Sequence, residues 1–502
     1  MALRKLLLCG GSAVLVASSA HGETLREALL KSYETNPTLA AQRDNVRAID
    51  ENVPLQRASA FPTVQLQTTH TELLKVQANS FLAPDRQLNS QLSVNAPIYE
   101  GGRVRNSIAA AETRVEAGRA SLRGTEADLF SNVVGAYMDV IRDEAIVALN
   151  LQNKSVLEVN LRASKDRFQV GDLTRTDVAQ SEARLALATS QLQTAQSRLI
   201  SSRETYVRLV GTPPGELEPP PALPQLPESP EKAVDVALSD NPALLAAKKA
   251  RDAAGLDIKV AQSARLPRLS AFASGGYVNF LGTLGAVPGQ TAVQQSTTAQ
   301  AGLQLTLPLY QGGQPAAQIR QAQARRSQSS EQMIETERGV IAQTRSAYAV
   351  WRSSLEVISS AEVAVNANKL ALEGVRAENG VGNRTILDIL DAEQELLNSQ
   401  VTLVTAQRDA YVAGFALLAA MGHAEARNLG LGGGALYDPT ANYDRVRNNL
   451  WDWGNGRNVP ATGTSTAQTP AQNSVVSRKL DPLLDTPIDT RGNNASGEQP
   501  KR

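Results

Sequence analysis

Two segments of the chain alternate apolar and polar side chains with a period of two, which is typical of half-buried β-strands. From Leu88 to Ile98 every second residue is apolar or small, and the residues between them as far as Asn95 are Asn, Gln and Ser. The stretch from Ala299 to Leu309 keeps the same phase, and a less regular strand-like segment precedes each stretch. The pattern therefore predicts four strands, at about residues 61–75, 87–99, 266–280 and 297–310.

A helical pattern follows each pair of strands. Between Arg103 and about Phe168 there is no proline and glycines are few, which predicts a rod about 100 Å long at about 1.5 Å per residue. The segments that return from these rods carry heptads, which in the second copy fall at Ile389, Leu396, Leu403, Ala410 and Leu417. Large residues alternating with Ala or Ser favour close coiled-coil packing between antiparallel helices. An ordinary helical bundle explains these stripes as well.

The whole pattern occurs twice. Asn36 and Asn241, each followed by proline, are 205 residues apart, and past the strands the offset is 211, as between Tyr137 and Tyr348. A constant offset over more than a hundred residues indicates an internal duplication. We expect a signal peptide at 1–22, a first repeat at 23–210, a Pro-rich linker at 211–230, a second repeat at 231–422 and a polar, largely disordered tail at 423–502.

The N-terminus predicts export. Arg4 and Lys5 precede an apolar run and a small-residue cleavage site, which together form a secretory signal. The only cysteine, Cys9, lies within that signal, so the mature chain has no disulfide. Across the 502 residues, 50 Lys and Arg balance 50 Asp and Glu, which gives no reason to expect nucleic acid as a partner. After Ala20 no apolar run is long enough for a membrane-spanning helix.

The strands can belong to a half-buried sheet in a soluble domain or can cross a membrane, tilted, with about 9–11 residues each. Their polar face is uncharged Gln, Asn, Ser and Thr, and the sequence offers no other strands to cover the apolar face. Four strands are too few to close a barrel, for which about eight are needed. Since open sheet edges are excluded from lipid, membrane strands would require several chains to share one barrel.

The reversals between the long helices have their own signatures. Gly171 and Gly382 suit a left-handed residue at a helix C-terminus. Soon afterwards Thr174 and Thr385 each stand three residues before an aspartate, which predicts capping boxes that restart the next helices.

Candidate catalytic chemistry is lacking in the sequence. His21 belongs to the signal peptide, and His70 and His423 stand alone, so no His, Cys and carboxylate cluster indicates a metal or a nucleophile. We expect neither an enzyme nor a bound cofactor.

The duplicated Asn-Pro helix, the Pro-x-Tyr-x-Gly-Gly joints at 97–102 and 308–313 and the reversal "VGNRTILDILDAEQEL" together resemble the TolC family of outer-membrane channel proteins. The resemblance covers residues 23–422 in order and in both repeats. It implies a mostly α fold with membrane β-strands. In it a homotrimer forms one 12-stranded β-barrel in outer-membrane lipid, with four strands per chain, and continues it as an α-helical coiled-coil barrel in the periplasm.

In such a family the protein is the exit duct of a tripartite efflux pump, of a type I secretion system, or of both. The resemblance implies two further partners, a periplasmic adaptor and an inner-membrane transporter of the RND, ABC or MFS type. The sequence leaves open whether the cargo is drugs or a secreted protein. The alternative is an exported trimeric coiled-coil protein with a structural, adhesive or receptor role, but the internal duplication and the strand pattern favour the duct.

The resemblance also implies a gate at the reversals. Asp388 and Asp391, three residues apart on one helix face, match the paired aspartates that ring the periplasmic aperture. Arg384 matches the arginine of the latch, with Thr176 and Asp177 as its expected partners. Members of the family often carry a tyrosine where this chain has Asn379, so part of the closed-state network is expected to differ. From the residues alone, acidic groups in a first helical turn are ordinarily just favourable to the helix dipole.

Two further sets of residues receive roles. The tips at Val170, Gly171, Val381 and Gly382 would form the adaptor docking surface. The joints would lie where each strand leaves the outer membrane, with prolines ending the ladder, tyrosines at the membrane interface and paired glycines allowing the bend. These joint residues are Pro97, Tyr99, Gly101, Gly102, Pro308, Tyr310, Gly312 and Gly313.

Overall fold

The computed structural model describes residues 22–75, 84–224, 226–285, 289, 291–431, 436–454, 456, 460–476 and 478–485. The expected signal peptide, apart from Gly22, lies outside the described residues. The helices are α1 Leu25–Thr35, α2 Pro37–Asp50, α3 Asn52–Ala58, α4 Arg103–Gln169, α5 Arg175–Val210, α6 Pro230–Asp240, α7 Pro242–Gln262, η1 Ser263–Arg265, α8 Gln314–Gly380, α9 Ile386–Ala420 and α10 Ala441–Val446. The strands are β1 Thr63–Glu72, β2 Arg86–Tyr99, β3 Arg268–Asn279 and β4 Gln295–Thr306.

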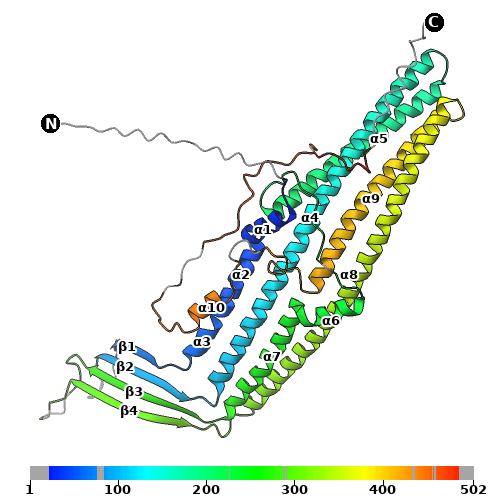
Figure 1. The fold of residues 1–502 in the computed structure, drawn as a ribbon. Coiled ribbons are helices and arrows are strands. Elements are labelled where there is room, and N and C mark those ends of the chain that lie inside the picture. The colour runs from blue at the N-terminus through cyan, green and yellow to red at the C-terminus, as the bar shows by residue number, and fades with distance from the viewer. Residues whose placement is uncertain are drawn as a thin grey trace, which may run out of the picture.

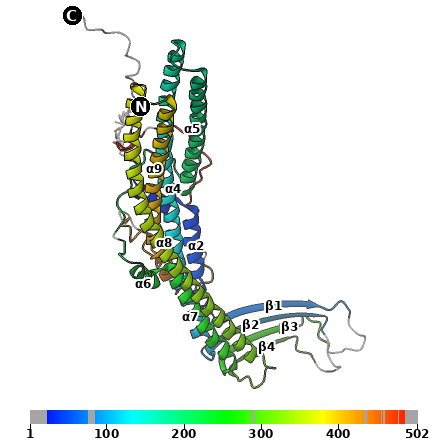
Figure 2. The same ribbon diagram turned by 90° about the vertical axis from the view of Figure 1, so that its right-hand side faces the viewer.

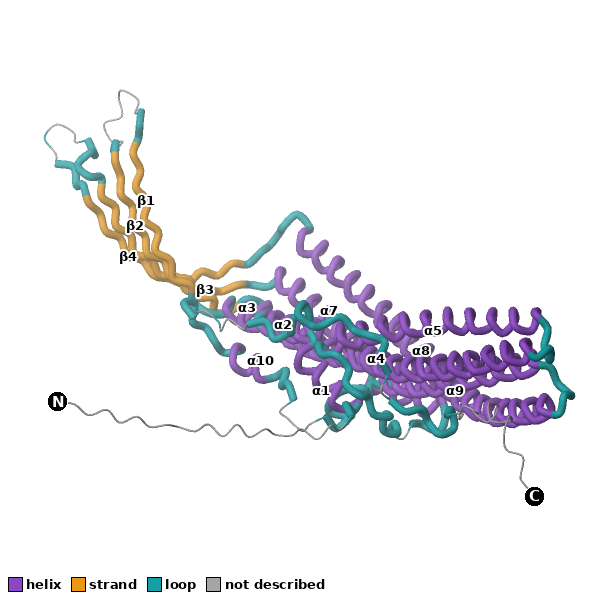
Figure 3. Tube along the Cα trace, turned by 90° about the horizontal axis from the view of Figure 1, so that it is seen from above, coloured by secondary structure: helices purple, strands orange, loops and turns teal. Residues whose placement is uncertain are grey.

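The molecule is a long bundle of helices with one four-stranded sheet at one end (Figure 1). The sheet turns away from the direction of the helices, as the perpendicular view in Figure 2 shows. The two turns that join α4 to α5 and α8 to α9 lie together at the end opposite the strands (Figure 3). The strands and the hairpin tips are therefore at opposite ends of one rod.

The sheet has the order β1-β2-β3-β4, and each neighbouring pair is antiparallel. The two strand pairs expected from the sequence are confirmed, and the pairing of β2 with β3 joins the two repeats into one sheet. Among the described residues β1 and β4 each pair with one strand, so both edges of the sheet are open there. On these edge strands Val64, Leu66, Leu303 and Leu305 are exposed.

The strand ends differ from the expectation in two places. Pro97 does not end the ladder: β2 runs to Tyr99, with an irregularity between the two residues. Beyond Asn95, which pairs with Thr63, β2 has no partner on the β1 side, and a proline is tolerated where one side of a strand is unpaired. β4 ends at Thr306, opposite the first residue of β3, four residues earlier than expected, so Pro308 lies outside the strand.

The long helices follow the duplication closely. α4 and α8 each have 67 residues, and α5 and α9 have 36 and 35. The start of α4 at Arg103 confirms the predicted rod. In α9 all five predicted heptad positions are buried. The pairs α4–α5 and α8–α9 therefore form two antiparallel hairpins, as the heptads predict.

The repeated Asn-Pro pair has a structural reason in both repeats. Asn36 caps α2 with its side-chain oxygen, which accepts from Thr38, while its amide donates to the Leu209 carbonyl at 2.9 Å. Asn241 caps α7 in the same way, and its amide donates to the Ala420 carbonyl at 2.9 Å. Each asparagine thus starts one helix and satisfies a carbonyl at the end of a hairpin.

The largest apolar core lies around the middle of the rod, where α1, α4, α5 and α9 meet. Tyr137, buried in this core, donates from its hydroxyl to the main-chain oxygens of Glu23 and Glu218, at 2.8 and 2.7 Å. Tyr348, the matching residue of the second repeat, donates to the Glu228 oxygen at 2.7 Å. Both tyrosines therefore hold segments that flank or form the linker between the repeats.

The C-terminal segment differs from the largely disordered tail that the sequence predicts. As far as Asp485 its described residues lie along the helices, with α10 as their only helix. Leu484 is buried among α4 and α9 residues, and the Gln400 side chain donates to its carbonyl at 2.8 Å. Apolar residues spaced widely in a polar segment thus fill grooves between the long helices. No described helix has the length and apolar composition needed to cross a bilayer.

Candidate functional site

The candidate site is the end of the rod where the two hairpins reverse. Gly171 and Gly382 have φ of 87° and 84°, the left-handed conformation expected at these helix ends. Their N–H groups donate to the carbonyls of Phe168 and Asn379, at 3.1 and 3.0 Å. The two reversals therefore share the left-handed glycine and the hydrogen bond that it donates.

Both capping boxes are confirmed. Asp177 accepts from the Thr174 N–H at 2.9 Å, and Asp388 accepts from the Thr385 N–H at 2.8 Å. Each threonine hydroxyl also accepts from the aspartate N–H. The hydrogen bonds from threonine lower the pKa of both aspartates below the ordinary value of 3.8, so both tips carry a negative charge.

The expected docking residues lie on the outermost turns. Val170 and Val381 are exposed apolar side chains, and a Cβ at Gly171 or Gly382 would meet nothing within 4 Å. The two valines are thus presented in the same way by both repeats.

The expected latch arginine has different partners within the chain. Arg384 donates from Nε to Glu378 at 2.8 Å, and its guanidinium lies 3.8 Å from Asp388. In the part of the chain that the structure describes, it is not brought to Thr176 or Asp177. Asn379, which stands where a tyrosine was expected, donates from its amide to the Arg384 carbonyl at 2.7 Å. This hydrogen bond therefore joins the two sides of the second tip, the end of α8 and the residue before Thr385.

Asp391 links the two hairpins. Its carboxylate accepts a hydrogen bond from Arg184 of α5, so the inner face of the second tip is tied to the first hairpin. The sequence analysis did not single out Arg184. Its position was a usable signal, because it follows Asp177 by two helical turns and lies on the same side of α5.

A buried carboxylate stands behind the tips. Glu393 accepts from Asn160 of α4 at 3.0 Å and from Arg376 of α8 at 3.2 Å, and its side chain is only 5% exposed. Burial is the main cause that raises its pKa above the ordinary value of 4.5. The sequence analysis missed Glu393. The offset of 211 was a usable signal, because it relates Arg376 and Glu393 to Lys165 and Glu182, which form the corresponding ion pair of the first repeat.

At the other end of the rod, the two joints differ in how they are covered. Gly101 and Gly312 both have positive φ, at 63° and 58°. The Gly101 Cα faces Leu266, where an added Cβ would come within 2.8 Å, whereas Gly312 faces open space. Tyr99 is 50% exposed and Tyr310 is 89% exposed. The first joint packs on the second repeat, and the second joint lies at the free edge of the sheet.

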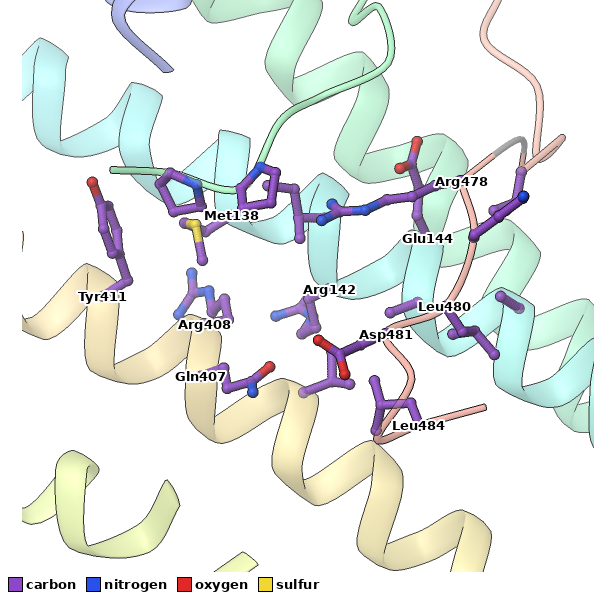
Figure 4. A pocket seen from close by; sticks show the side chains of 18 residues that line it. Met138, Arg142, Glu144, Gln407, Arg408, Tyr411, Arg478, Leu480, Asp481 and Leu484 are labelled. Atoms are coloured by element: carbon purple, nitrogen blue, oxygen red, sulfur yellow. The ribbon is translucent and has the colours of Figure 1, made fainter. Parts of the chain in front are cut away.

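A cavity of about 300 Å³ lies between α4, α9, the linker and the C-terminal segment. Its lining includes Arg408 and Tyr411 of α9 and Arg478 of the C-terminal segment (Figure 4). Arg408 pairs with Asp139 at 2.9 Å, and Arg142 pairs with the same carboxylate at 2.8 Å. Among the described residues no group of three or more His, Cys, Asp or Glu could hold a metal ion.

Comparison with known proteins identifies the family. The model of the family described as outer membrane efflux protein matches residues 29–212 and 233–423. The outer membrane efflux protein BepC of Brucella suis is 34% identical over 436 residues, which cover 86% of this chain and 92% of BepC. The alkaline protease secretion protein AprF of Pseudomonas aeruginosa is 26% identical over 427 residues, which cover 82% of this chain and 87% of AprF.

The fold has solved counterparts. The Campylobacter jejuni CmeC outer membrane channel superposes with a TM-score of 0.70 at 17% identity, over 86% of this chain and 90% of CmeC. The relatives support the duct over the structural, adhesive or receptor alternative, and they place the protein in the outer membrane with a periplasmic extension. The chain therefore belongs to the outer membrane efflux protein family, the TolC family that its sequence resembles, whose members are channels.

Proposed function

We propose that three copies of this chain form the exit duct that leads from an inner-membrane transporter, of the RND, ABC or MFS type, through a periplasmic adaptor to the cell exterior. The observation that carries this proposal is the open sheet: in the described part of the chain β1 and β4 have no outer partners, and they expose apolar side chains. In lipid such edges require partners, which β4 of one copy and β1 of the next can supply. Three sheets of four strands would then close one 12-stranded barrel against outer-membrane lipid.

At the other end, the tips form the gate in this proposal. Asp388 and Asp391 of three copies would bring six carboxylates around the axis, and such a ring attracts cations. Arg384, held by Glu378 and near Asp388, would set how closely these tips approach, together with Asn379 on the same tip. Thr176 and Asp177 of a neighbouring copy are the partners that we propose for Arg384 in the closed assembly.

The adaptor would dock on the tips. Val170 and Val381 are exposed, and Gly171 and Gly382 leave the backbone beside them free of neighbouring side chains. An exposed valine on each of the six tips of a trimer would give a ring of small apolar contacts, into which helical ends of an adaptor can fit.

Conductance of the purified protein in planar bilayers tests the duct and its gate. We expect small, cation-selective conductance for the wild type, loss of cation selectivity for Asp388→Ala/Asp391→Ala, and larger conductance for Arg384→Ser. Glu182→Ala is the matched control, because this carboxylate is exposed and pairs with Lys165 within the first hairpin. Absence of channel activity in every variant would overturn the duct. Unchanged selectivity in the double variant would overturn the gate alone.

The cargo is proposed from the relatives. BepC, named as an efflux protein, is the more similar of the two relatives compared, so efflux of small molecules is the first candidate. AprF, named for secretion of an alkaline protease, supports type I secretion as the second. A deletion strain tested both for drug susceptibility and for loss of secreted proteins distinguishes them. Increased susceptibility with unchanged secretion supports efflux, and the reverse result supports secretion.

A further inference from the structure

The C-terminal segment after residue 435 runs beside α2 and α3 toward the sheet. Near its start, the Arg43 guanidinium of α2 lies over the Tyr437 ring, 5.0 Å from the ring centre. Further along, the amide of Asn442 donates to Asp50 at 2.9 Å, at the end of α2. Residue numbers rise together on both sides, so the segment runs parallel to the helices that lead to β1.

The segment continues in that direction past α10. In α3, Arg57 donates to the Arg447 carbonyl at 3.1 Å and to the Asn448 side chain at 2.5 Å. β1 begins at Thr63, only six residues beyond Arg57. Figure 1 shows α10 beside α3, close to where the strands leave the helices. By Asn448 the segment has therefore nearly reached the boundary between helices and sheet.

The segment then returns. The Thr464 N–H donates to the Thr35 carbonyl at 3.3 Å, and Gly463 packs so closely on Pro37 that a Cβ would come within 3.0 Å. Thr35 ends α1 and Pro37 begins α2, at the end of α2 that lies away from the sheet. The described residues thus reach the helix–sheet boundary at Asn448 and lie back beside the start of α2 at Gly463 and Thr464.

At this turn the chain exposes its largest apolar side chains. Leu450, Trp451 and Trp453 are 46%, 70% and 84% exposed. The turn is fixed by local hydrogen bonds, in which the Trp451 N–H donates to the Asn449 side chain at 3.2 Å and the Trp451 carbonyl accepts from Gly454 at 3.3 Å. A contiguous exposed patch of this kind marks an interaction surface.

We propose that Leu450, Trp451 and Trp453 form a lipid anchor, which inserts the two indole rings among the phospholipids of the periplasmic leaflet of the outer membrane. Tryptophan concentrates at such interfaces because its ring is apolar while its N–H can bond to headgroups or water. Phe61, Tyr99 and Tyr310, which lie beside the ends of β1, β2 and β4 where the chain passes between sheet and helices, are exposed aromatic residues as well. The anchor rests on the outer-membrane location and does not depend on the gate or the cargo.

The chain provides a clean spectroscopic test, because it has only three tryptophans. In Trp351→Phe, all tryptophan emission comes from Trp451 and Trp453. We reconstitute this full-length variant in phosphatidylglycerol/phosphatidylcholine vesicles whose acyl chains are brominated either near the headgroup or near the methyl end. We expect bromine near the headgroup to remove roughly half of the emission, and bromine near the methyl end to remove much less.

The matched control is Trp451→Phe/Trp453→Phe, which leaves Trp351. That residue follows Gln314 by 37 positions in α8, about 55 Å along the helix, and packs edge-on to Tyr348. Its emission should be the same in both kinds of vesicle, and far-ultraviolet circular dichroism should show that both variants fold.

Two outcomes would overturn the anchor. Emission of Trp451 and Trp453 that neither brominated lipid quenches, but that aqueous acrylamide does quench, would show a turn that faces water. Emission that none of these quenchers affects would show that the turn is covered by protein, such as a second copy of the chain.

Discussion

The two repeats have matching helices but different surroundings. α4 and α8 have the same length, yet α4 is covered by α1, α2, α3, α5, α7 and α9, while α8 is covered by α6, α7 and α9. As a result Val350, Val357, Val363 and Leu370 of α8 are exposed. The duplicated sequence pattern specifies each helical hairpin. The helices that pack on a hairpin differ between the repeats, because the chain segments around each repeat differ. The open face of α8 is the surface that the proposed trimer would cover.

The largest expected difference between the repeats concerns two matching ion pairs. Arg376 and Glu393 of the second hairpin are 29% and 5% exposed, whereas Lys165 and Glu182 of the first are 51% and 53% exposed. Breaking a buried pair leaves an uncompensated charge, so Glu393→Ala should lower the free energy of unfolding by about 3–5 kcal/mol. Glu182→Ala should lower it by about 0–1 kcal/mol. Urea titration of the detergent-solubilised protein measures both.

The same glutamate should give the repeats different pH dependence. Burial raises the folded-state pKa of Glu393 above 4.5, so the folded state holds this proton more tightly than the unfolded state does. Its contribution to stability is fully present below pH 4.5 and is lost as pH rises through the raised pKa. Glu393→Gln should remove this decline, while Glu182→Gln should leave it. A decline that persists in Glu393→Gln would assign it to another group.

The next largest difference is expected at the glycine joints. An alanine at Gly101 would adopt a left-handed conformation and press on Leu266, which together should cost about 2–4 kcal/mol. At Gly312 only the conformational cost of about 1–2 kcal/mol remains. Thermal unfolding of Gly101→Ala and Gly312→Ala compares the two. An equal loss at both positions would mean that a neighbouring chain packs on Gly312.

A smaller difference is expected between the matching tyrosines. Tyr137→Phe removes a buried hydroxyl that donates to two main-chain oxygens and should cost about 1–2 kcal/mol. The hydroxyl of Tyr348 donates to the Glu228 oxygen near the surface, where water can replace it, so Tyr348→Phe should cost less than about 1 kcal/mol. The difference in urea midpoints measures this. A larger loss for Tyr348→Phe would show that the second linker contact is the more protected one in the assembly.

Much of this fold follows from local sequence patterns. The capping boxes, the helix starting at Arg103 and the heptads of α9 depend on spacing within one segment, so periodicity was enough to predict them. The end of β4 could not be predicted in this way. It lies opposite the first residue of β3, and where the neighbouring strand begins is a tertiary property.

In the candidate site, too, the residues that belong to local motifs were predicted and those that depend on tertiary contacts were not. Asp177 and Asp388 were found from their capping motifs and the family resemblance. Arg184 and Glu393 were missed because their partners lie on other helices: Asp391 for Arg184, and Asn160 and Arg376 for Glu393. The C-terminal segment was expected to be largely disordered because its composition is polar. Its docking rests on single residues such as Leu484, which no compositional average detects.

The smallest effect on stability is expected for the two capping aspartates, and here we expect the same effect in both repeats. Asp177 and Asp388 cap matching helices, and hydrogen bonds from threonine lower the pKa of each. Both contributions are present above pH 3.8 and are lost as pH falls through the lowered pKa values. Asp177→Asn and Asp388→Asn should therefore lower the melting temperature slightly and equally, while conductance separates them. Only Asp388 lies beside Arg384 and three residues from Asp391, so its replacement should reduce cation selectivity. Equal effects on conductance would place both carboxylates in the proposed constriction and would make the two tips equivalent in function as well as in backbone.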